Sequence, residues 1–553
     1  MPAIFVALFF AWPVITMLIR GFTSDDGGGT LATVTSVMAS ARTWGLIRTT
    51  LLQAVIATAA ATALGVPAAY LLYRTRFPGR SAVRGIITVP FVLPTVVVGV
   101  AMRALFRTDG WMGVLGLDHT MAAVVVALVF FNISVVARTV GGVWERLDPR
   151  AEQAARALGA TPFRALRTVT LPQLIPAITS AAGVTFLFCA TAFGVVLVLG
   201  GPQYATVETE IYRQTTQFLN LPTAAVLSLV QIVMVVASLG AAAAARRRTE
   251  RTLAVTTEAR AAHRWSHSNP GDVVAAIITG VTAAVLIIAP LGALLLRSFQ
   301  DAHGNFTLMN YQNLGTTGSR NALNVTVWHA LGTSLRTAFI AALVAMVVGS
   351  LAALVLSRRP RNQMAVRALM GFDALLMLPL GVSAVTVGFG FLVTFTTRLP
   401  GGMDIRTSGL LVPLAQAVVA IPMVVRTMLP VLRGIDPRQR EVAAVLGASP
   451  ARVLWTVDVP LAARSAAMAL GFALAISLGE FGATAFLARP DSATLPVVIV
   501  RLMSRPGADN YAMALAASVI LAALTAALML LAERAATLDR YAGAATTASE
   551  THA

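Results

Sequence analysis

The amino-acid sequence predicts an all-α integral membrane protein of about twelve transmembrane helices, arranged as two parallel repeats of six. The first observation is composition: 57% of the 553 residues are hydrophobic and only 12% are charged, about half the charged fraction of a soluble domain. The second is a series of twelve apolar stretches of membrane-spanning length. The third is a loop motif that occurs twice.

The twelve stretches are each long enough, or nearly so, for a helix to cross a bilayer, which takes about 20 apolar residues. They are continuous and do not alternate with a period of two, which excludes an outer-membrane barrel. We expect spans near residues 3–20, 46–73, 83–106, 120–143, 174–199, 223–245, 273–297, 331–357, 366–396, 409–431, 464–488 and 512–532.

The distribution of arginine predicts the orientation. The chain has no lysine, so all 42 basic residues are arginines, against 24 acidic residues. With the N-terminus inside, 28 arginines fall on the inner side, in 74–84, 138–172, 246–272, 358–367, 426–464 and after 532. Because positive residues gather in cytoplasmic loops, both termini are predicted to be cytoplasmic. The net charge of +18 is then mainly topological, and we do not expect nucleic-acid binding.

The repeated motif defines two halves. The stretch DPRAEQAARALGATPFRALRTVTLP begins at Asp148, and DPRQREVAAVLGASPARVLWTVDVP begins at Asp436, an offset of 288 residues. Upstream, Arg48-Thr49 matches Arg336-Thr337 at the same offset. Six predicted spans separate the copies, so both loops face the same side and the halves are parallel repeats.

Each loop, 144–172 and 432–460, predicts a helical elbow. In the first copy, Asp148-Pro149 is typical of a helix start. Gly159 suits a left-handed helix end, and Thr161-Pro162 starts a second short helix. Pro172 then returns the chain to the membrane. The second copy repeats this order with Asp436-Pro437, Gly447, Ser449-Pro450 and Pro460.

The spacing of these residues resembles the cytoplasmic signature loop of binding-protein-dependent ABC importer permeases of the type I fold. On this resemblance the elbow is the coupling helix that contacts ATP-binding subunits. Gln153 stands where the family has glutamate, and Val442 where it has alanine. The residues carried over are Asp148, Glu152, Gln153, Ala154, Ala155, Gly159 and Pro172, then Asp436, Glu441, Ala443, Gly447 and Pro460.

The resemblance implies a transport subunit and not an enzyme, in a bacterial inner membrane. Its implied partners are two copies of an ABC ATP-binding subunit, an extracytoplasmic substrate-binding protein and the lipid bilayer. ATP and magnesium would be bound by the partner subunits, with no cofactor in this chain. Independently, a chain without lysine cannot contain the phosphate-binding G-x-x-x-x-G-K-[ST] motif.

The fusion of two halves in one chain resembles the thiamine and iron(III) importer permeases. The stretches 189–214 and 477–499 are more similar to the thiamine type. We therefore expect the substrate to be thiamine or one of its phosphates, with iron(III) as the alternative. The predicted halves are residues 1–245 and 273–535, joined by a basic linker, 246–272, and followed by a cytoplasmic tail, 536–553.

Charged residues at membrane depth are costly and indicate function by default. Glu480 is the first candidate for the translocation pathway, together with Phe481 and its repeat mate Phe193. The Glu480 carboxylate has no acidic repeat mate. It could attract a cation, or it could pair with an arginine or lie at the water boundary. Glu208 and Glu210 are expected to face solvent or a docked binding protein.

Two other classes of membrane protein fit the sequence less well. A polytopic membrane enzyme would need clustered catalytic groups, and the sequence has neither an H-E-x-x-H motif nor another metal-ligand spacing. We therefore expect no catalytic residues and no metal site. A secondary transporter would typically show inverted repeats and acidic residues at the membrane midplane, whereas this sequence shows parallel repeats and few acidic residues.

Overall fold

The computed structural model of this chain describes residues 1–22, 30–201, 203–249, 263–267, 269–358, 362–395 and 409–550. In these ranges, ten helices are long and apolar enough to cross a membrane, and two helix pairs, each broken by a sharp bend, bring the number to twelve. The bends are 106° between α5 and α6 and 95° between α18 and α19. The prediction of an all-α protein with about twelve spans is confirmed.

The first half runs from α1 to α13. Its helices are α1 Pro2–Val6, α2 Trp12–Phe22, α3 Thr30–Ala39, α4 Ala41–Arg74, α5 Arg80–Thr88, α6 Thr95–Phe106, α7 Met121–Trp144, α8 Arg150–Ala157, α9 Pro162–Ala165, α10 Leu171–Ala190, α11 Gly194–Leu199, α12 Val207–Thr216 and α13 Leu221–Thr249. A two-residue strand, β1 Thr75–Arg76, follows α4 and pairs in parallel with β2 His263–Arg264.

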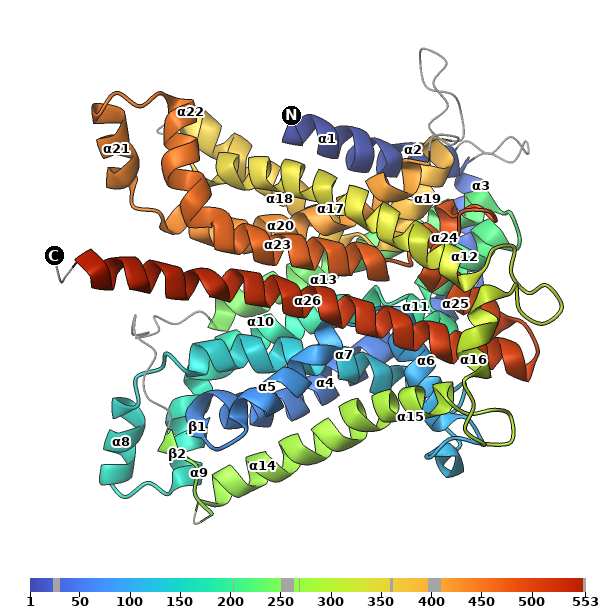
Figure 1. The fold of residues 1–553 in the computed structure, drawn as a ribbon, viewed down its shortest axis with the longest axis horizontal. Helices are drawn as coiled ribbons and strands as arrows, with labels where there is room; N and C mark the ends of the chain where they lie inside the picture. Colours follow the sequence, from blue (N-terminus) through green and yellow to red (C-terminus); the bar gives the residue numbers. More distant parts are fainter. Residues whose placement is uncertain are drawn as a thin grey trace.

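The second half runs from α14 to α26. Its helices are α14 Pro270–Thr282, α15 Ala289–Ser298, α16 Met309–Gln312, α17 Val327–Ser357, α18 Gln363–Gly381, α19 Ala384–Thr394, α20 Leu411–Gly434, α21 Pro437–Val445, α22 Pro450–Val453, α23 Val459–Gly479, α24 Thr484–Leu487, α25 Leu495–Ser504 and α26 Ala508–Glu550. Both elbows, α8 and α21, lie at the same end of the molecule, on the left of Figure 1. We call this the elbow end, and the end with α12, α16 and α25 the loop end.

Two predicted spans end earlier than expected. The stretches 174–199 and 464–488 leave the helix at Ala190 and Gly479, and short helices, α11 and α24, follow each break. Glycines let these returning segments pack against the bends: a Cβ at Gly194 would lie 2.7 Å from Thr95 Oγ1, and one at Gly482 would lie 2.8 Å from the Ala384 Cβ. Hydropathy shows that such a segment is apolar but not that the helix is broken within it.

The offset of 288 residues does not extend to the first core helix of each half. Small residues let α4 pack closely on α7 and α17 on α20, and a Cβ at Gly65 or Gly349 would lie 2.7 Å from Val136 or Val424. The valines keep the offset of 288, whereas the glycines are 284 apart. The buried alanines of α4 and α17 follow the same shorter offset, so equating Arg48-Thr49 with Arg336-Thr337 was wrong by about one helical turn.

The first span of the second half packs against the first half. At the elbow end, the Tyr70 hydroxyl of α4 donates to the Asp272 carboxylate of α14 at 2.7 Å. At the loop end, Arg297 of α15 is paired with Asp109, which follows α6. The α14–α15 span is therefore held to the first half at both ends.

The first span of the first half packs, in turn, against the second half. Phe9 and Trp12 place their rings 6.2 Å and 5.9 Å from the ring of Phe395, which follows α19. A Cβ at Gly390 would lie 3.1 Å from the Pro13 carbonyl oxygen, so α2 and α19 are in close contact. The first span of each half thus packs against the other half, as expected for two parallel repeats around a pseudo-twofold axis.

Candidate functional site

The elbow helices end at the expected glycines, and α21 also begins at the expected residue. Asp436 caps α21 by accepting from the Arg438 backbone N–H at 3.0 Å. Asp148 makes the same contact with Arg150 at 3.0 Å, although α8 itself begins only at Arg150. Gly159 and Gly447 then take φ values of +87° and +82°, a left-handed conformation that an L side chain rarely adopts.

The second elbow helix is not a separate helix, contrary to the prediction. Residues Pro162–Ala190 and Pro450–Gly479 each form one continuous helix that runs from the elbow into the membrane. Pro172 and Pro460 lie inside these helices, just after π-helical turns at Leu166–Thr170 and Leu454–Asp458. Because proline lacks an N–H and its ring clashes with the carbonyl four residues earlier, a locally widened turn lets the helix continue past it.

A polar contact ties each elbow helix to the base of the following span. In the first half, the Thr170 hydroxyl donates to Glu152 at 3.0 Å. In the second, Arg440 Nε donates to Asp458 Oδ1 at 2.7 Å, and Arg358 donates to the other oxygen at 3.0 Å. Residues 152 and 440, like 170 and 458, occupy equivalent positions. The roles of Arg440 and Asp458 were not predicted. A comparison of the two copies would have indicated them, because Glu152 and Thr170 in the first copy are both replaced, by Arg440 and Asp458, in the second.

The remaining elbow residues lie on the surface. Gln153, Ala154 and Glu441 are exposed, and Ala155 and Ala443 are half-buried. The equivalent leucines before the glycines, Leu158 and Leu446, are 89% and 81% exposed. Each elbow therefore presents an apolar side chain with no covering element in the described part of the chain.

Phe193 and Phe481 meet between the two halves. Their rings stack with centroids 5.2 Å apart and planes 10° from parallel, and both side chains are buried. The two residues are repeat mates, and equivalent residues of two symmetric units contact each other only at the symmetry axis. The pair therefore marks the pseudo-twofold axis, beside the breaks that end α10 and α23.

Glu480, the neighbour of Phe481, uses both carboxylate oxygens within its own turn. It accepts from the backbone N–H groups of Ala483 at 2.7 Å and Thr484 at 3.0 Å, and from the Thr484 hydroxyl at 2.5 Å. It is buried, with 6% of its surface exposed. This arrangement differs from an arginine pair and from a position at the water boundary, and it stabilises the turn into α24.

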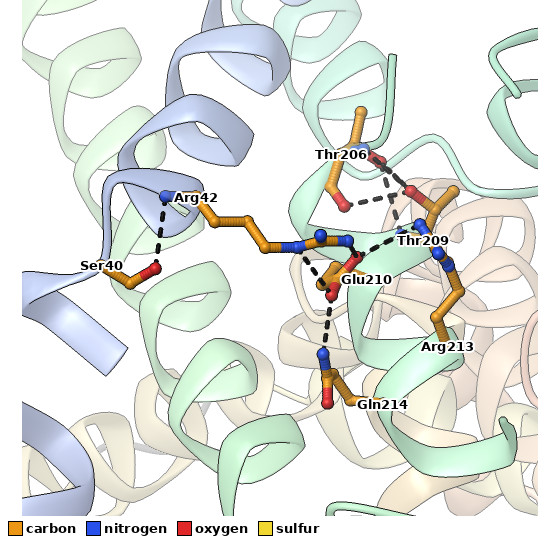
Figure 2. A network of polar contacts seen from close by, with 7 residues as sticks. All are labelled: Ser40, Arg42, Thr206, Thr209, Glu210, Arg213 and Gln214. Atoms are coloured by element: carbon orange, nitrogen blue, oxygen red, sulfur yellow. Dashed lines mark hydrogen bonds and ion pairs between the residues drawn. The ribbon is translucent and has the colours of Figure 1, made fainter. Parts of the chain in front are cut away.

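Glu210 is buried rather than facing solvent as expected. Figure 2 shows Arg42 reaching from the start of α4 to Glu210 on α12, with Nε and Nη2 donating at 3.2 Å and 2.9 Å. Gln214 donates to the same carboxylate at 2.7 Å, and Arg213 lies 3.7 Å away. This network fixes α12 against α4 at the loop end.

Glu208 is also buried, which corrects the second expectation of solvent exposure. It lies on α12, outside the membrane-spanning helices, and accepts from the Ser383 hydroxyl of the second half at 2.7 Å. Burial raises the pKa of the Glu208 carboxyl to about 8, and the hydrogen bond from Ser383 and the nearby Gln231 side chain offset only part of this rise. In contrast to Glu210, none of the interactions that shift this pKa comes from an arginine.

A cavity of about 990 Å³ opens between the halves toward the elbow end. Arg80, Arg84 and Arg138 of the first half contribute to one wall, and Phe472 and Glu533 of the second half contribute to the other. The loop-end side of the axis is thus filled by stacked rings, whereas open space between the halves is found nearer the elbows.

Two parallel six-span halves, matched elbows at one end and paired residues on a central axis define a membrane permease. The chain belongs to the family of binding-protein-dependent transport system inner membrane components, which it matches twice, over residues 61–250 and 345–537. It is therefore a transport subunit, not an enzyme, and a multi-pass protein of the inner membrane. Each predicted half contains nearly all of one match.

Comparison with individual proteins gives relatives of similar length. The chain is 28% identical over 471 residues to the thiamine transport system permease protein of Escherichia coli (strain K12), covering 82% of each chain. It is 26% identical over 507 residues to the protein of the same name in Brucella abortus (strain 2308), covering 89% of this chain and 88% of the relative. A solved bacterial ABC transporter involved in alginate import is 18% identical, with a TM-score of 0.40, over 45% of this chain and 93% of that one.

Proposed function

We propose that this chain is the fused permease subunit of an ATP-driven importer for thiamine or its phosphates. The observation that carries this proposal is that relatives named as thiamine permeases align with 82% to 89% of the chain, through both halves. The alternative is an iron(III) importer of the same fused type, and a transport assay would distinguish the two substrates.

The elbows are the proposed contacts for two ATP-binding subunits, which would hold ATP and magnesium. Leu158 and Leu446 support this assignment, because two equivalent exposed leucines offer the same apolar contact to two copies of one partner. The residues proposed for coupling are Asp148, Glu152, Gln153, Ala154, Ala155, Gly159 and Pro172 in the first loop, and Asp436, Glu441, Ala443, Gly447 and Pro460 in the second. In this arrangement the elbow end is cytoplasmic, with both termini, and a substrate-binding protein docks at the loop end.

The proposed pathway follows the axis between the halves and is closed by Phe193 and Phe481. Because the two buried rings stack on each other with centroids 5.2 Å apart, a solute that passes between them requires the rings to separate. Glu480 holds the turn that carries Phe481, and we assign it this positioning role beside the pathway. The domain limits stay a prediction: most of the linker 246–272, and the last three residues of the tail 536–553, lie outside the described residues.

The test is uptake by proteoliposomes that contain this chain with its ATP-binding subunit, energised from the elbow side and supplied with the substrate-binding protein. We expect ATP-dependent accumulation of radiolabelled thiamine and none of iron(III). ATP-dependent accumulation of iron(III) without thiamine would contradict the proposed substrate while leaving the permease assignment intact.

A further inference from the structure

Glu208 is a buried carboxylate at the boundary between the two halves. None of its surface is exposed, and its Oε2 is held by Ser383, which lies at the bend between α18 and α19. Its other oxygen, Oε1, has no hydrogen-bond partner among the described residues. A buried carboxyl group with an oxygen that lacks a hydrogen bond is costly whether it is protonated or ionised, so its presence calls for a function.

The surroundings of Glu208 contain a second acceptor whose hydrogen bonding is incomplete. The Gln231 side chain of α13 lies beside the carboxylate, and its amide nitrogen donates to the Ala190 carbonyl at 3.2 Å. The Gln231 Oε1 has no partner among the described residues either. The site therefore has acceptor oxygens to offer, and it would be completed by a ligand that brings positive charge or N–H donors.

Aromatic rings continue from Glu208 to the axis. Tyr212 is one helical turn further along α12, on the same face as Glu208. Its ring lies 5.3 Å from the ring of Phe193 and 5.5 Å from that of Phe486. Phe193 in turn stacks on Phe481. A carboxylate one helical turn from a cluster of aromatic rings combines the two kinds of group that proteins use to bind organic cations.

This arrangement occurs in only one half. The repeat mates of Glu208 and Tyr212 are Pro496 and Val500 on α25, so the second half supplies neither the charge nor the ring. Glu210 also lacks an acidic mate, but Arg42 already neutralises it. One carboxylate near a twofold axis matches one singly charged molecule passing between the halves.

We propose that Glu208, Tyr212 and the Phe193–Phe481 pair form a binding site for an organic cation with a flat ring, entered when the stacked phenylalanines separate. The proposal rests on the proposed function, in which the thiazolium ring of thiamine would be that cation. Glu208 would contact the charge, while Tyr212 and the phenylalanines would contact the ring faces. The arriving cation would also favour the ionised carboxylate and so offset the cost of its burial.

The test compares uptake of thiamine with uptake of a neutral analogue in which a thiophene ring replaces the thiazolium. Proteoliposomes with the complete transporter and saturating binding protein are used for wild type, Glu208→Gln and Glu210→Gln. We expect Glu208→Gln to lower the ratio of thiamine to analogue uptake about tenfold, the loss expected for one charge-assisted contact. Glu210→Gln removes an equivalent charge on the same helix and should leave the ratio unchanged.

An unchanged ratio in Glu208→Gln would overturn the site while leaving the proposed function intact. Absence of thiamine uptake by the wild-type protein would instead contradict the proposed function and, with it, this inference. If Glu208→Gln does not assemble, Tyr212→Leu gives a second reading. It keeps the carboxylate and should lower uptake of both ring compounds several-fold relative to wild type; wild-type uptake of both would overturn the aromatic part of the site.

Discussion

At the scale of single residues, two acids two positions apart on α12 have different environments. Glu210 is neutralised by Arg42 and held by Gln214, whereas Glu208 has only uncharged hydrogen-bond donors beside it. The sequence places both in an apparently exposed loop between spans, because neither hydropathy nor the repeat shows that α12 folds back between the halves. The partners of both acids come from residues far away in the chain, and this information is absent from local patterns.

The Arg42–Glu210 pair should contribute to stability mainly because Arg42 neutralises the buried Glu210 carboxylate. Arg42→Ala should lower the free energy of unfolding by about 1 to 2 kcal/mol, less than for a fully buried pair because the Arg42 side chain is 57% exposed. Thermal unfolding in detergent measures this change.

The control is Arg48→Ala, which removes an exposed arginine from the same helix and should have little effect. Adding Glu210→Gln to Arg42→Ala should recover part of the lost stability, because the remaining side chain then carries no charge. Equal effects of Arg42→Ala and Arg48→Ala would show that the pair is not stabilising.

At the scale of elements, the elbow helices are where local sequence is most informative. An Asp-Pro start and a glycine end predicted α8 and α21 correctly, since capping and left-handed turns depend on nearby residues. The same reasoning was wrong at Pro172 and Pro460, where a π-helical turn accommodates the proline inside a longer helix. The twelve apolar stretches were also predicted, but not the bends of about 100° at Thr95 and Ser383, which depend on packing against the other half.

The glycine turns should be required for coupling. Proline cannot adopt the positive φ of Gly159 and Gly447, because its ring fixes φ near about −65°. We expect the double variant Gly159→Pro/Gly447→Pro to hydrolyse ATP in the assembled transporter without accumulating substrate. The ratio of substrate transported to ATP hydrolysed is the measurement.

Asparagine is the matched replacement, because it tolerates the left-handed conformation better than other side chains. Gly159→Asn/Gly447→Asn should therefore keep most of the wild-type ratio. A correctly inserted double proline variant with the wild-type ratio would contradict the role assigned to the elbows.

At the scale of the whole molecule, the structure is two parallel halves that exchange their first spans and meet on one axis. The duplication and the common orientation of the loops were predictable from the repeated motif. The exchange was not, because α2 and α14 are apolar on most of their surface and the sequence does not say which neighbour covers them. The contact of Phe193 with Phe481 follows once the axis is known, and it supplies the proposed closure of the pathway.

Joining the two residues on the axis tests whether the pathway runs between the halves. The single native cysteine is first replaced by Cys189→Ala, and Phe193→Cys/Phe481→Cys is then bridged by oxidation or a short bifunctional thiol reagent. We expect bridged transporters in proteoliposomes to bind ATP but take up no thiamine, and a reductant to restore uptake. Undiminished uptake while the two halves remain bridged would show that the pathway does not pass between Phe193 and Phe481.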